Sequence, residues 1–105
     1  MQAVYKLLGL GQRSRNVVSG DEGVRAKLER HQARLVIVAR DAAPATRRDF
    51  VALSARYAVP CVEFGTKGEL GIAVGKSPRA VLALLEDNLA RRVLDLLEST
   101  EDGSV

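Results

Sequence analysis

The sequence predicts an α/β protein, a three-layer α/β/α sandwich around a mixed four-stranded sheet. Segments with helical patterning alternate with short apolar segments along the whole chain, as is typical of folds with helices on both faces of a sheet. One continuous apolar run, Leu35–Ala39, lacks polar alternation, which indicates a strand buried on both faces. A chain of 105 residues can bury one core but not two. We therefore expect a single domain over residues 1–98, followed by a frayed acidic C-terminal tail over residues 99–105.

The first part of the chain is expected to form a helix, a strand and a second helix. Apolar side chains between residues 2 and 13 favour a helix, and residues 16–19 favour a short strand. The second helix is expected over residues 21–31, because Gly20 precedes two acids that stabilise the positive end of a helix dipole. Within it, the four-residue spacing from Val24 to the next leucine gives one apolar stripe.

The middle of the chain is expected to form a buried strand, a third helix and another strand. Pro44 opens the helix, because proline suits the first helical turn. Residues 61–64, which follow Pro60, form the next strand. One face of the helix between them carries Phe50, Leu53, Ser54 and Tyr57.

The last third of the chain contains a glycine-rich segment between two apolar runs. Thr66 is the expected cap of a short helix that ends at Gly71 or Gly75, and residues 80–85 favour a fourth strand. A final amphipathic helix is marked by Leu89, Val93, Leu96 and Leu97. Loops held between regular elements are where binding functions concentrate, so the loop after Gly75 is a candidate site.

The charge distribution suggests a polyanionic partner. Residues 1–85 carry 14 basic and 7 acidic side chains, a net +7, whereas residues 86–105 carry six acids and two arginines, a net −4. A basic body is typical of nucleic-acid binding; a solvated arginine-rich surface is the alternative explanation. The mean hydropathy of −0.02 and the lack of a long apolar run predict a soluble, cytoplasmic protein without a membrane span.

No arrangement of residues in the sequence predicts catalysis. Residues 71–77 resemble a phosphate-binding P-loop, but three residues separate their glycines where that motif needs four. The lone His31 and the lone Cys61 lack sequence neighbours that would activate them or complete a metal site. Asp41 follows a strand and is expected to cap a turn. We therefore expect no enzyme activity, no cofactor and no metal.

Two loops offer a binding surface instead. Gly20 and Gly75 allow a ligand to approach the backbone closely, and the N–H groups at the helix start after Gly20 suit a phosphate or a base edge. Aromatic residues are scarce, with two Tyr and two Phe, so recognition of RNA shape fits better than base stacking. Basic side chains available to a nucleic-acid backbone are Arg25, Lys27, Lys67, Lys76 and Arg79.

Three motifs, in this order, resemble the L-seven-Ae/L-thirty-e ribosomal protein superfamily. They are Ser19-Gly20 at a helix start, Ala39-Arg40-Asp41 at a strand end, and Thr66-Lys67-x-Glu69-Leu70-Gly71-x-Ala73-x-Gly75. The resemblance covers roughly residues 4–97 and is nearest to the small bacterial members of the YlxQ type. It implies an L-thirty-e-like sandwich that binds RNA kink-turns and has no cofactor or catalytic activity.

The resemblance also implies two RNA-binding places. In the family, a Gly-x-Asn-Glu-x-x-Lys pattern at the start of the second helix reads the sheared G·A pairs of the kink. Here that pattern falls on Gly20, Glu22, Gly23 and Ala26, where only the glycine matches, and Arg25 and Lys27 flank the lysine position. The second place is the loop formed by Gly75, Lys76, Ser77, Pro78 and Arg79.

We therefore expect a non-catalytic RNA-binding protein. Its expected partner is structured RNA, either ribosomal RNA or a kink-turn, and the ribosome is a further candidate. The alternative is a protein–protein adaptor on the same fold with little or no RNA affinity, which would use the acidic last helix or an apolar helix face.

Overall fold

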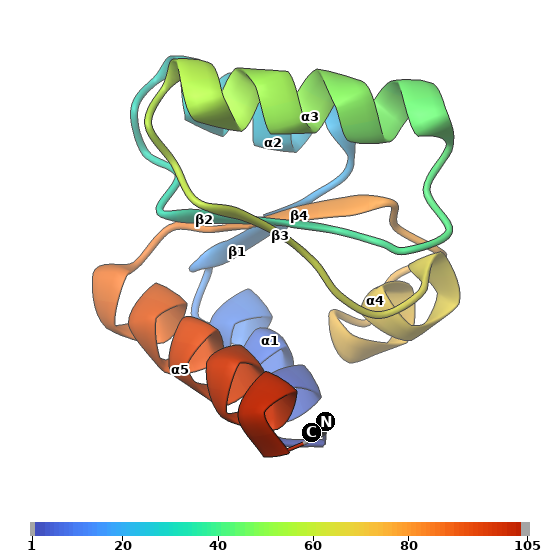
Figure 1. Ribbon diagram of the computed structural model, residues 1–105, viewed down its shortest axis with the longest axis vertical. Helices are drawn as coiled ribbons and strands as arrows, with labels where there is room; N and C mark the ends of the chain where they lie inside the picture. Colours follow the sequence, from blue (N-terminus) through green and yellow to red (C-terminus); the bar gives the residue numbers. More distant parts are fainter. Residues whose placement is uncertain (1, 104–105) are drawn as a thin grey trace.

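The computed structural model describes residues 2–103, with side chains for residues 2–99, and it confirms the expected sandwich (Figure 1). Helices and strands alternate along the chain as the sequence predicts. In order, the elements are α1 (Gln2–Arg13), β1 (Val17–Ser19), α2 (Asp21–Glu29), β2 (Leu35–Val38), α3 (Pro44–Arg56), β3 (Cys61–Glu63), α4 (Lys67–Ala73), β4 (Val81–Leu84) and α5 (Asp87–Gly103). Among the described residues, no helix is long and apolar enough to cross a membrane.

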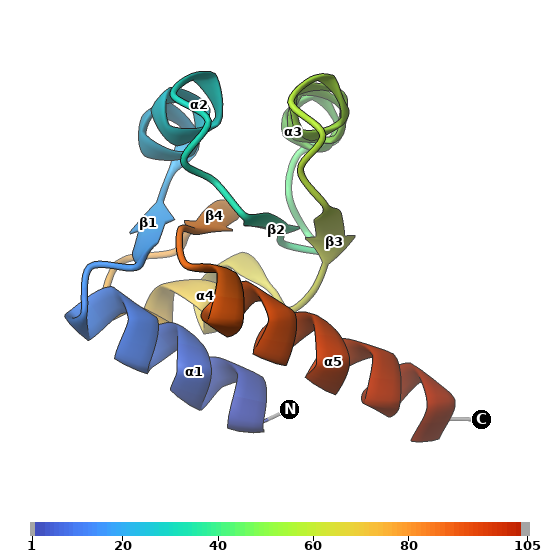
Figure 2. The ribbon, with the colours of Figure 1, turned by 90° about the vertical axis from the view of Figure 1, so that its left-hand side faces the viewer.

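The four strands form one mixed sheet in the order β1-β4-β2-β3. Strand β4 pairs antiparallel with both β1 and β2, and only β2 and β3 are parallel. The register places Val38 opposite Val81 and Leu35 opposite Leu84. Helices α2 and α3 cover one face of the sheet, and α1, α4 and α5 cover the other (Figures 1 and 2).

The two central strands are buried at every position, as the apolar run in β2 predicts. Each helix layer adds large apolar side chains to these strands, among them Leu8 from α1, Leu28 from α2 and Phe50 from α3, all fully buried. Burial of one such side chain stabilises the fold by about 1.5–3 kcal/mol. The sheet is therefore a rigid base for the loops at its edges.

Three helices end in residues with a left-handed backbone. Arg15, His31 and Ala58, which follow α1, α2 and α3, have φ values of 64°, 60° and 57°. At the second of these ends, the His31 N–H donates to the Leu28 carbonyl at 3.0 Å and the next N–H donates to the Lys27 carbonyl at 2.9 Å. This Schellman pattern reverses the chain. Helix α2 consequently ends at Glu29, two residues earlier than predicted.

The C-terminal helix passes the expected domain boundary without a break. Its buried face includes Leu89 and Val93, as the amphipathic pattern predicts, and the helical backbone continues through Gly103. No proline interrupts residues 99–103, so the helix can extend into the acidic stretch. Residues 104–105 lie outside the described residues, and the fraying of the tail stays a prediction.

Candidate nucleic-acid interface

Two loops from distant parts of the chain meet at one edge of the sheet, at the right of Figure 1. Strands β1 and β4 are antiparallel neighbours, so the end of β1 lies beside the start of β4, with Ser19 opposite Leu82. The Gly20 N–H donates to the Val81 carbonyl at 3.0 Å. We call residues 19–22 and 75–79 together the two-loop edge.

The side chain of Arg79 connects the two loops. Its Nε donates to the Ser19 hydroxyl at 3.1 Å, and its Nη1 donates to the Ser77 hydroxyl at 2.7 Å. The same Nη1 lies 3.3 Å from the carbonyl oxygens of Ser77 and Pro78, and the Arg79 N–H donates to the Lys67 carbonyl at 3.0 Å. These hydrogen bonds hold the Arg79 side chain between the two loops, and the expected direct contact of Arg79 with RNA stays a prediction.

The start of α4, which carries the second loop, is fixed by a capping box. The Thr66 hydroxyl accepts from the Glu69 N–H at 3.1 Å, and the Glu69 carboxylate accepts from the Thr66 N–H at 2.9 Å. These bonds confirm the expected cap. The Thr66 backbone bond, followed by the bond from the Tyr5 hydroxyl, lowers the pKa of Glu69. Asp41 accepts from the Lys67 N–H at 2.8 Å, which confirms its expected capping role.

The end of α4 folds the second loop back onto the helix. Gly75 has a φ of 71°, its N–H donates to the Ile72 carbonyl at 3.1 Å, and the Lys76 N–H donates to the Gly71 carbonyl at 2.8 Å. Helix α4 thus ends at Ala73, and Gly75, the second of the two predicted end points, is the left-handed residue just beyond its cap. A Cβ at Gly71 would lie 2.8 Å from the Ser77 carbonyl carbon and would also contact its oxygen. Only glycine at position 71 lets the loop pack this closely.

Gly20 and Gly75, the two glycines that were expected to let a ligand approach, have open space on the side where a Cβ would lie. Gly20 has φ 92° and ψ 159°, a conformation that is essentially restricted to glycine. A Cβ at Gly20 or at Gly75 would meet nothing within 4 Å. The backbone of the two-loop edge is therefore accessible from outside. Contact of a ligand with either backbone stays a prediction.

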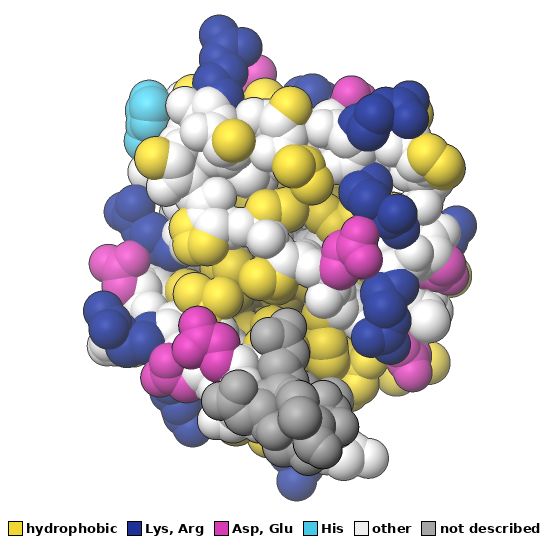
Figure 3. Space-filling model, in the orientation of Figure 1, with side chains coloured by type: hydrophobic (Ala, Val, Ile, Leu, Met, Phe, Trp, Pro, Cys, Tyr) yellow, Lys and Arg dark blue, Asp and Glu magenta, His cyan; other side chains and the backbone are white. Residues whose placement is uncertain are grey.

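The exposed side chains of the two-loop edge carry both signs of charge. Lys76 and Pro78 are exposed in the second loop, and Asp21 and Glu22 are exposed in the first turn of α2. Within the described residues, neither Lys76 nor Glu22 forms a side-chain hydrogen bond or ion pair. Figure 3 shows the face formed by α3 and β3, where Lys and Arg gather on the side of α4 with acids between them.

Two predicted RNA-binding side chains of α2 form contacts within the protein. The Arg25 Nε lies 3.2 Å from the Asp21 carboxylate, and its guanidinium lies 5.1 Å from the Phe50 ring centroid, towards α3. The hydrogen bond to Asp21 raises the pKa of Arg25. The Lys27 Nζ donates to the Gln32 side chain at 3.1 Å, at the other end of α2. Arg25 therefore borders the two-loop edge through Asp21, Lys27 lies away from it, and contact of either cation with RNA stays a prediction.

Gly23, which stands where the family pattern has a glutamate, has a packing role. A Cβ at this position would lie 2.7 Å from Cγ2 of Val18, because α2 packs onto β1 here. A side chain at position 23 would start towards the sheet instead of towards a ligand at the two-loop edge. The structure therefore separates Gly23 from Gly20, although both were expected to belong to one RNA-binding pattern.

Three residues that the sequence suggested for other roles shape this edge. Ser19 accepts from Arg79, Gly71 allows the close packing of the second loop, and Lys67 accepts the Arg79 backbone N–H. In the sequence, Gly75 indicated the end of a helix, and Gly71, four positions earlier, indicated a close contact with that helix. No sequence signal pairs Ser19 with Arg79, because that contact depends on the strand order. Among the described residues, no group of three or more His, Cys, Asp or Glu side chains could hold a metal ion.

This geometry defines a class of protein: a small L-thirty-e-like α/β/α sandwich that displays two loops at one edge of its sheet. The sequence profile described as "Ribosomal protein L7Ae/L30e/S12e/Gadd45 family" matches residues 2–94. The chain therefore belongs to this family, and the resemblance seen in the sequence is confirmed.

Known relatives agree with this membership. The chain is 31% identical to "RNA-binding protein YlxQ" of Enterococcus faecium, over 92% of this chain and 93% of the relative. It is 32% identical to the protein of the same name of Bacillus subtilis (strain 168), over 90% and 94% of the two chains. Neither name is that of an enzyme.

Two solved structures share the fold. A protein of unknown function from Bacillus halodurans C superposes with a TM-score of 0.86 at 29% identity, covering 90% of this chain and 96% of that chain. The Giardia lamblia 15.5kD RNA binding protein superposes with a TM-score of 0.78 at 24% identity, covering 91% and 85% of the two chains. At that identity, the second likeness supports the fold alone.

Proposed function

We propose that this chain is a non-catalytic RNA-binding protein that binds structured RNA, either a kink-turn or ribosomal RNA, on the two-loop edge. The observation that carries the proposal is the bond from Arg79 to Ser19, which connects the two loops that contain the open glycines. Family membership and the names of the two bacterial relatives support RNA as the ligand.

In this proposal each exposed group has a distinct task. The open backbone at Gly20 and at Gly75 lets RNA approach closely, and N–H groups at the start of α2 donate to phosphate or base acceptors. Lys76 contacts a phosphate. The Glu22 carboxylate can only accept, so it pairs with amino or imino groups of bases and disfavours phosphate at the same spot. Arg79 holds the loops in position.

The mixed charges of the two-loop edge favour recognition of shape over strong electrostatic attraction. In the second loop, the Lys76 side chain forms no hydrogen bond within the described residues. The first loop carries two acids, Asp21 and Glu22. A protein that neutralises few phosphates shows a shallow dependence of affinity on salt. We therefore expect the ratio of the affinities for a folded RNA and a plain duplex to be larger than the factor by which added salt lowers the affinity.

Fluorescence anisotropy with labelled RNA tests the proposal. A kink-turn RNA, a ribosomal RNA fragment and a plain duplex of equal length are titrated with the whole chain at about 50 mM salt. We expect a folded RNA to bind more tightly than the duplex, and Lys76→Ala to weaken binding about three- to tenfold. The matched control Lys27→Ala should leave affinity unchanged, because Lys27 lies at the other end of α2.

Absence of binding to all three RNAs would overturn the proposal. An equal loss in the Lys27→Ala and Lys76→Ala variants would instead show that the two-loop edge is not the site. Cytoplasmic location, association with the ribosome and a role in translation belong to the same proposal. Co-sedimentation with ribosomal subunits that is lost on Lys76→Ala tests the ribosomal part.

A further inference from the structure

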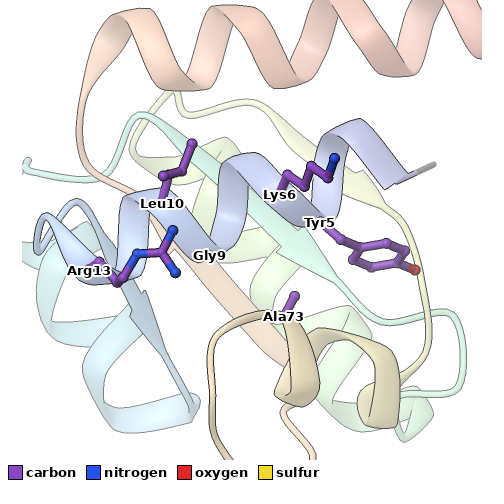
Figure 4. Close-up of a pocket in the computed structure, with 6 residues that line it drawn as sticks. All are labelled: Tyr5, Lys6, Gly9, Leu10, Arg13 and Ala73. Atoms are coloured by element: carbon purple, nitrogen blue, oxygen red, sulfur yellow. The ribbon is translucent and has the colours of Figure 1, made fainter.

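A second surface lies along helix α1, where that helix meets α4 (Figure 4). The two helices approach closely because position 9 is glycine: a Cβ there would lie 3.1 Å from the carbonyl oxygen of Ala73. Above this contact is an open hollow of about 480 Å³. Its lining residues are Tyr5, Lys6, Gly9, Leu10, Arg13 and Ala73. We call it the α1–α4 groove.

The α1–α4 groove has an exposed aliphatic surface. Leu10, which lines the groove, is 53% exposed on α1, and the lining residues Gly9 and Ala73 add no polar side chain beside it. Ile72, next to Ala73 in sequence, is 81% exposed on α4 but does not line the groove. The apolar contact that the groove offers is therefore centred on Leu10.

Two cations flank the apolar part of the groove. Lys6, Leu10 and Arg13 occupy positions i, i+4 and i+7, so they share one face of α1 with the cations about 10 Å apart. Both cations are exposed, and neither forms a side-chain hydrogen bond or ion pair within the described residues. The nearby acid Glu69 is engaged by the Tyr5 hydroxyl and the Thr66 N–H. The groove is therefore apolar at its centre and positive at both ends.

We propose that the α1–α4 groove docks an acidic segment of a partner protein that places an aliphatic side chain over Leu10. Charge complementarity selects an acidic partner, because Lys6 and Arg13 have no acidic partner within the described residues. The surface is aliphatic, and the groove's one ring, Tyr5, packs against Phe64 with 5.0 Å between ring centroids. A base-stacking platform for single-stranded RNA needs exposed aromatic faces.

This interaction is distinct from RNA binding at the two-loop edge. The groove uses the side of α4 that faces α1, whereas RNA is assigned to the loop beyond its C-terminal end. An acidic partner and an RNA can therefore occupy one molecule together. A stable protein interface buries about 800 Å² per partner, and we expect one docked segment to make a smaller, transient contact.

The test uses defined peptides and the full-length chain labelled with nitrogen-15. The probe is a synthetic helical peptide with leucines at i, i+4 and i+7 flanked by glutamates. We expect a Kd on the order of 10–100 µM that weakens with salt. Chemical-shift changes should centre on Lys6, Leu10, Arg13 and Ala73. A peptide with lysines in place of the glutamates and one with serines in place of the leucines should each bind about tenfold more weakly or worse.

Matched variants assign the binding to the groove. Leu10→Ala should weaken peptide binding about fivefold, and Lys6→Glu combined with Arg13→Glu should abolish it. The controls are Val51→Ala, at a side chain that is 50% exposed on α3, and Arg30→Glu combined with Arg48→Glu at exposed positions elsewhere. We expect the controls to bind the peptide normally and every groove variant to bind RNA normally.

Four outcomes would overturn the proposal. They are shift changes outside the groove, an equal loss in the control variants, saturation of the groove by a single-stranded RNA oligonucleotide in place of the acidic peptide, and a dimer in light scattering that Leu10→Ala dissociates. The last outcome would assign the groove to a second copy of the chain. Failure of RNA binding would leave the peptide result intact, so the two proposals fail separately.

Discussion

The guanidinium of Arg79 donates to the hydroxyl of Ser19 at 3.1 Å across 60 positions of sequence. The contact is partly buried and joins the end of β1 to the loop that precedes β4. A hydrogen bond from a charged donor contributes about 1.5–3 kcal/mol. This pair of side chains thus adds to the backbone pairing of β1 with β4 in setting the relative position of the two loops.

A double-mutant cycle measures this dependence. Ser19→Ala removes the acceptor, and Arg79→Lys keeps the charge but loses the guanidinium geometry that reaches Ser19 and Ser77 together. We expect each variant to weaken RNA binding, and the double variant to be no weaker than the worse single one, with a coupling energy of about 1 kcal/mol. Strictly additive losses would show that the two residues act independently.

Gly71 and Gly68 offer a comparison within one helix. A Cβ at position 71 would lie 2.8 Å from the Ser77 carbonyl carbon, whereas one at position 68 would have its nearest neighbour 4.0 Å away. In urea denaturation, we expect Gly68→Ala to stabilise the protein by up to about 1 kcal/mol, from helix propensity. Gly71→Ala should destabilise it by about 1–3 kcal/mol, from overpacking, and weaken RNA binding. Equal effects of the two substitutions would contradict the close packing of the loop.

The two open glycines should respond differently to asparagine. Gly75 has a left-handed backbone that asparagine adopts, so Gly75→Asn should cost about 0.5 kcal/mol or less. Gly20 occupies a region that is essentially restricted to glycine, so Gly20→Asn should cost about 1–3 kcal/mol although the site has room. Ala58, at the equivalent end of α3, gives the reverse test: Ala58→Gly should stabilise the protein by about 0.5 kcal/mol. Thermal and urea unfolding measure all three.

Acid should weaken the start of α4. Hydrogen bonds from the Thr66 backbone and then from the Tyr5 hydroxyl hold the pKa of Glu69 below its ordinary range. Since the folded pKa is the lower one, the carboxylate contributes stability above the unfolded pKa of about 4.3, and this contribution is lost as pH falls through the folded pKa. We expect Glu69→Gln to lower the unfolding midpoint at neutral pH, with the difference shrinking in acid. A constant difference across this range would exclude the charged capping box as its cause.

Local sequence signals predicted most of the fold. The bounds of α1, the buried strand β2, the Pro44 helix start and the Thr66 cap all follow from side chains within one turn or one strand. The capping role of Asp41 was also predicted, but its partner, the Lys67 N–H, lies 26 positions further along the chain and could not be read from sequence neighbours. Features formed by neighbours in sequence can be recognised from the sequence alone.

The candidate site was predicted less completely, because tertiary contacts decide which side chains are available. Arg25 packs over the Phe50 ring and pairs with Asp21 of the two-loop edge, so its charge is partly neutralised within the protein, and Lys27 bonds to Gln32 at the other end of α2. Gly23 was interpreted through a family pattern but is needed where α2 packs onto Val18. The role of Arg79 depends on the pairing of β1 with β4, which no single stretch of sequence encodes.

The central place of β4 fixes the length of the second loop. Lys76 is bonded to Gly71, and Arg79 is bonded to the Lys67 backbone and to Ser19. The chain then enters a strand that is buried on both sides and paired on both edges. An added or removed residue would have to break one of these bonds or shift the strand register. If this loop binds RNA as proposed, replacement of side chains between Lys76 and Pro78 can change its RNA preference without disturbing the sheet. Insertions or deletions in the same segment would disturb the sheet.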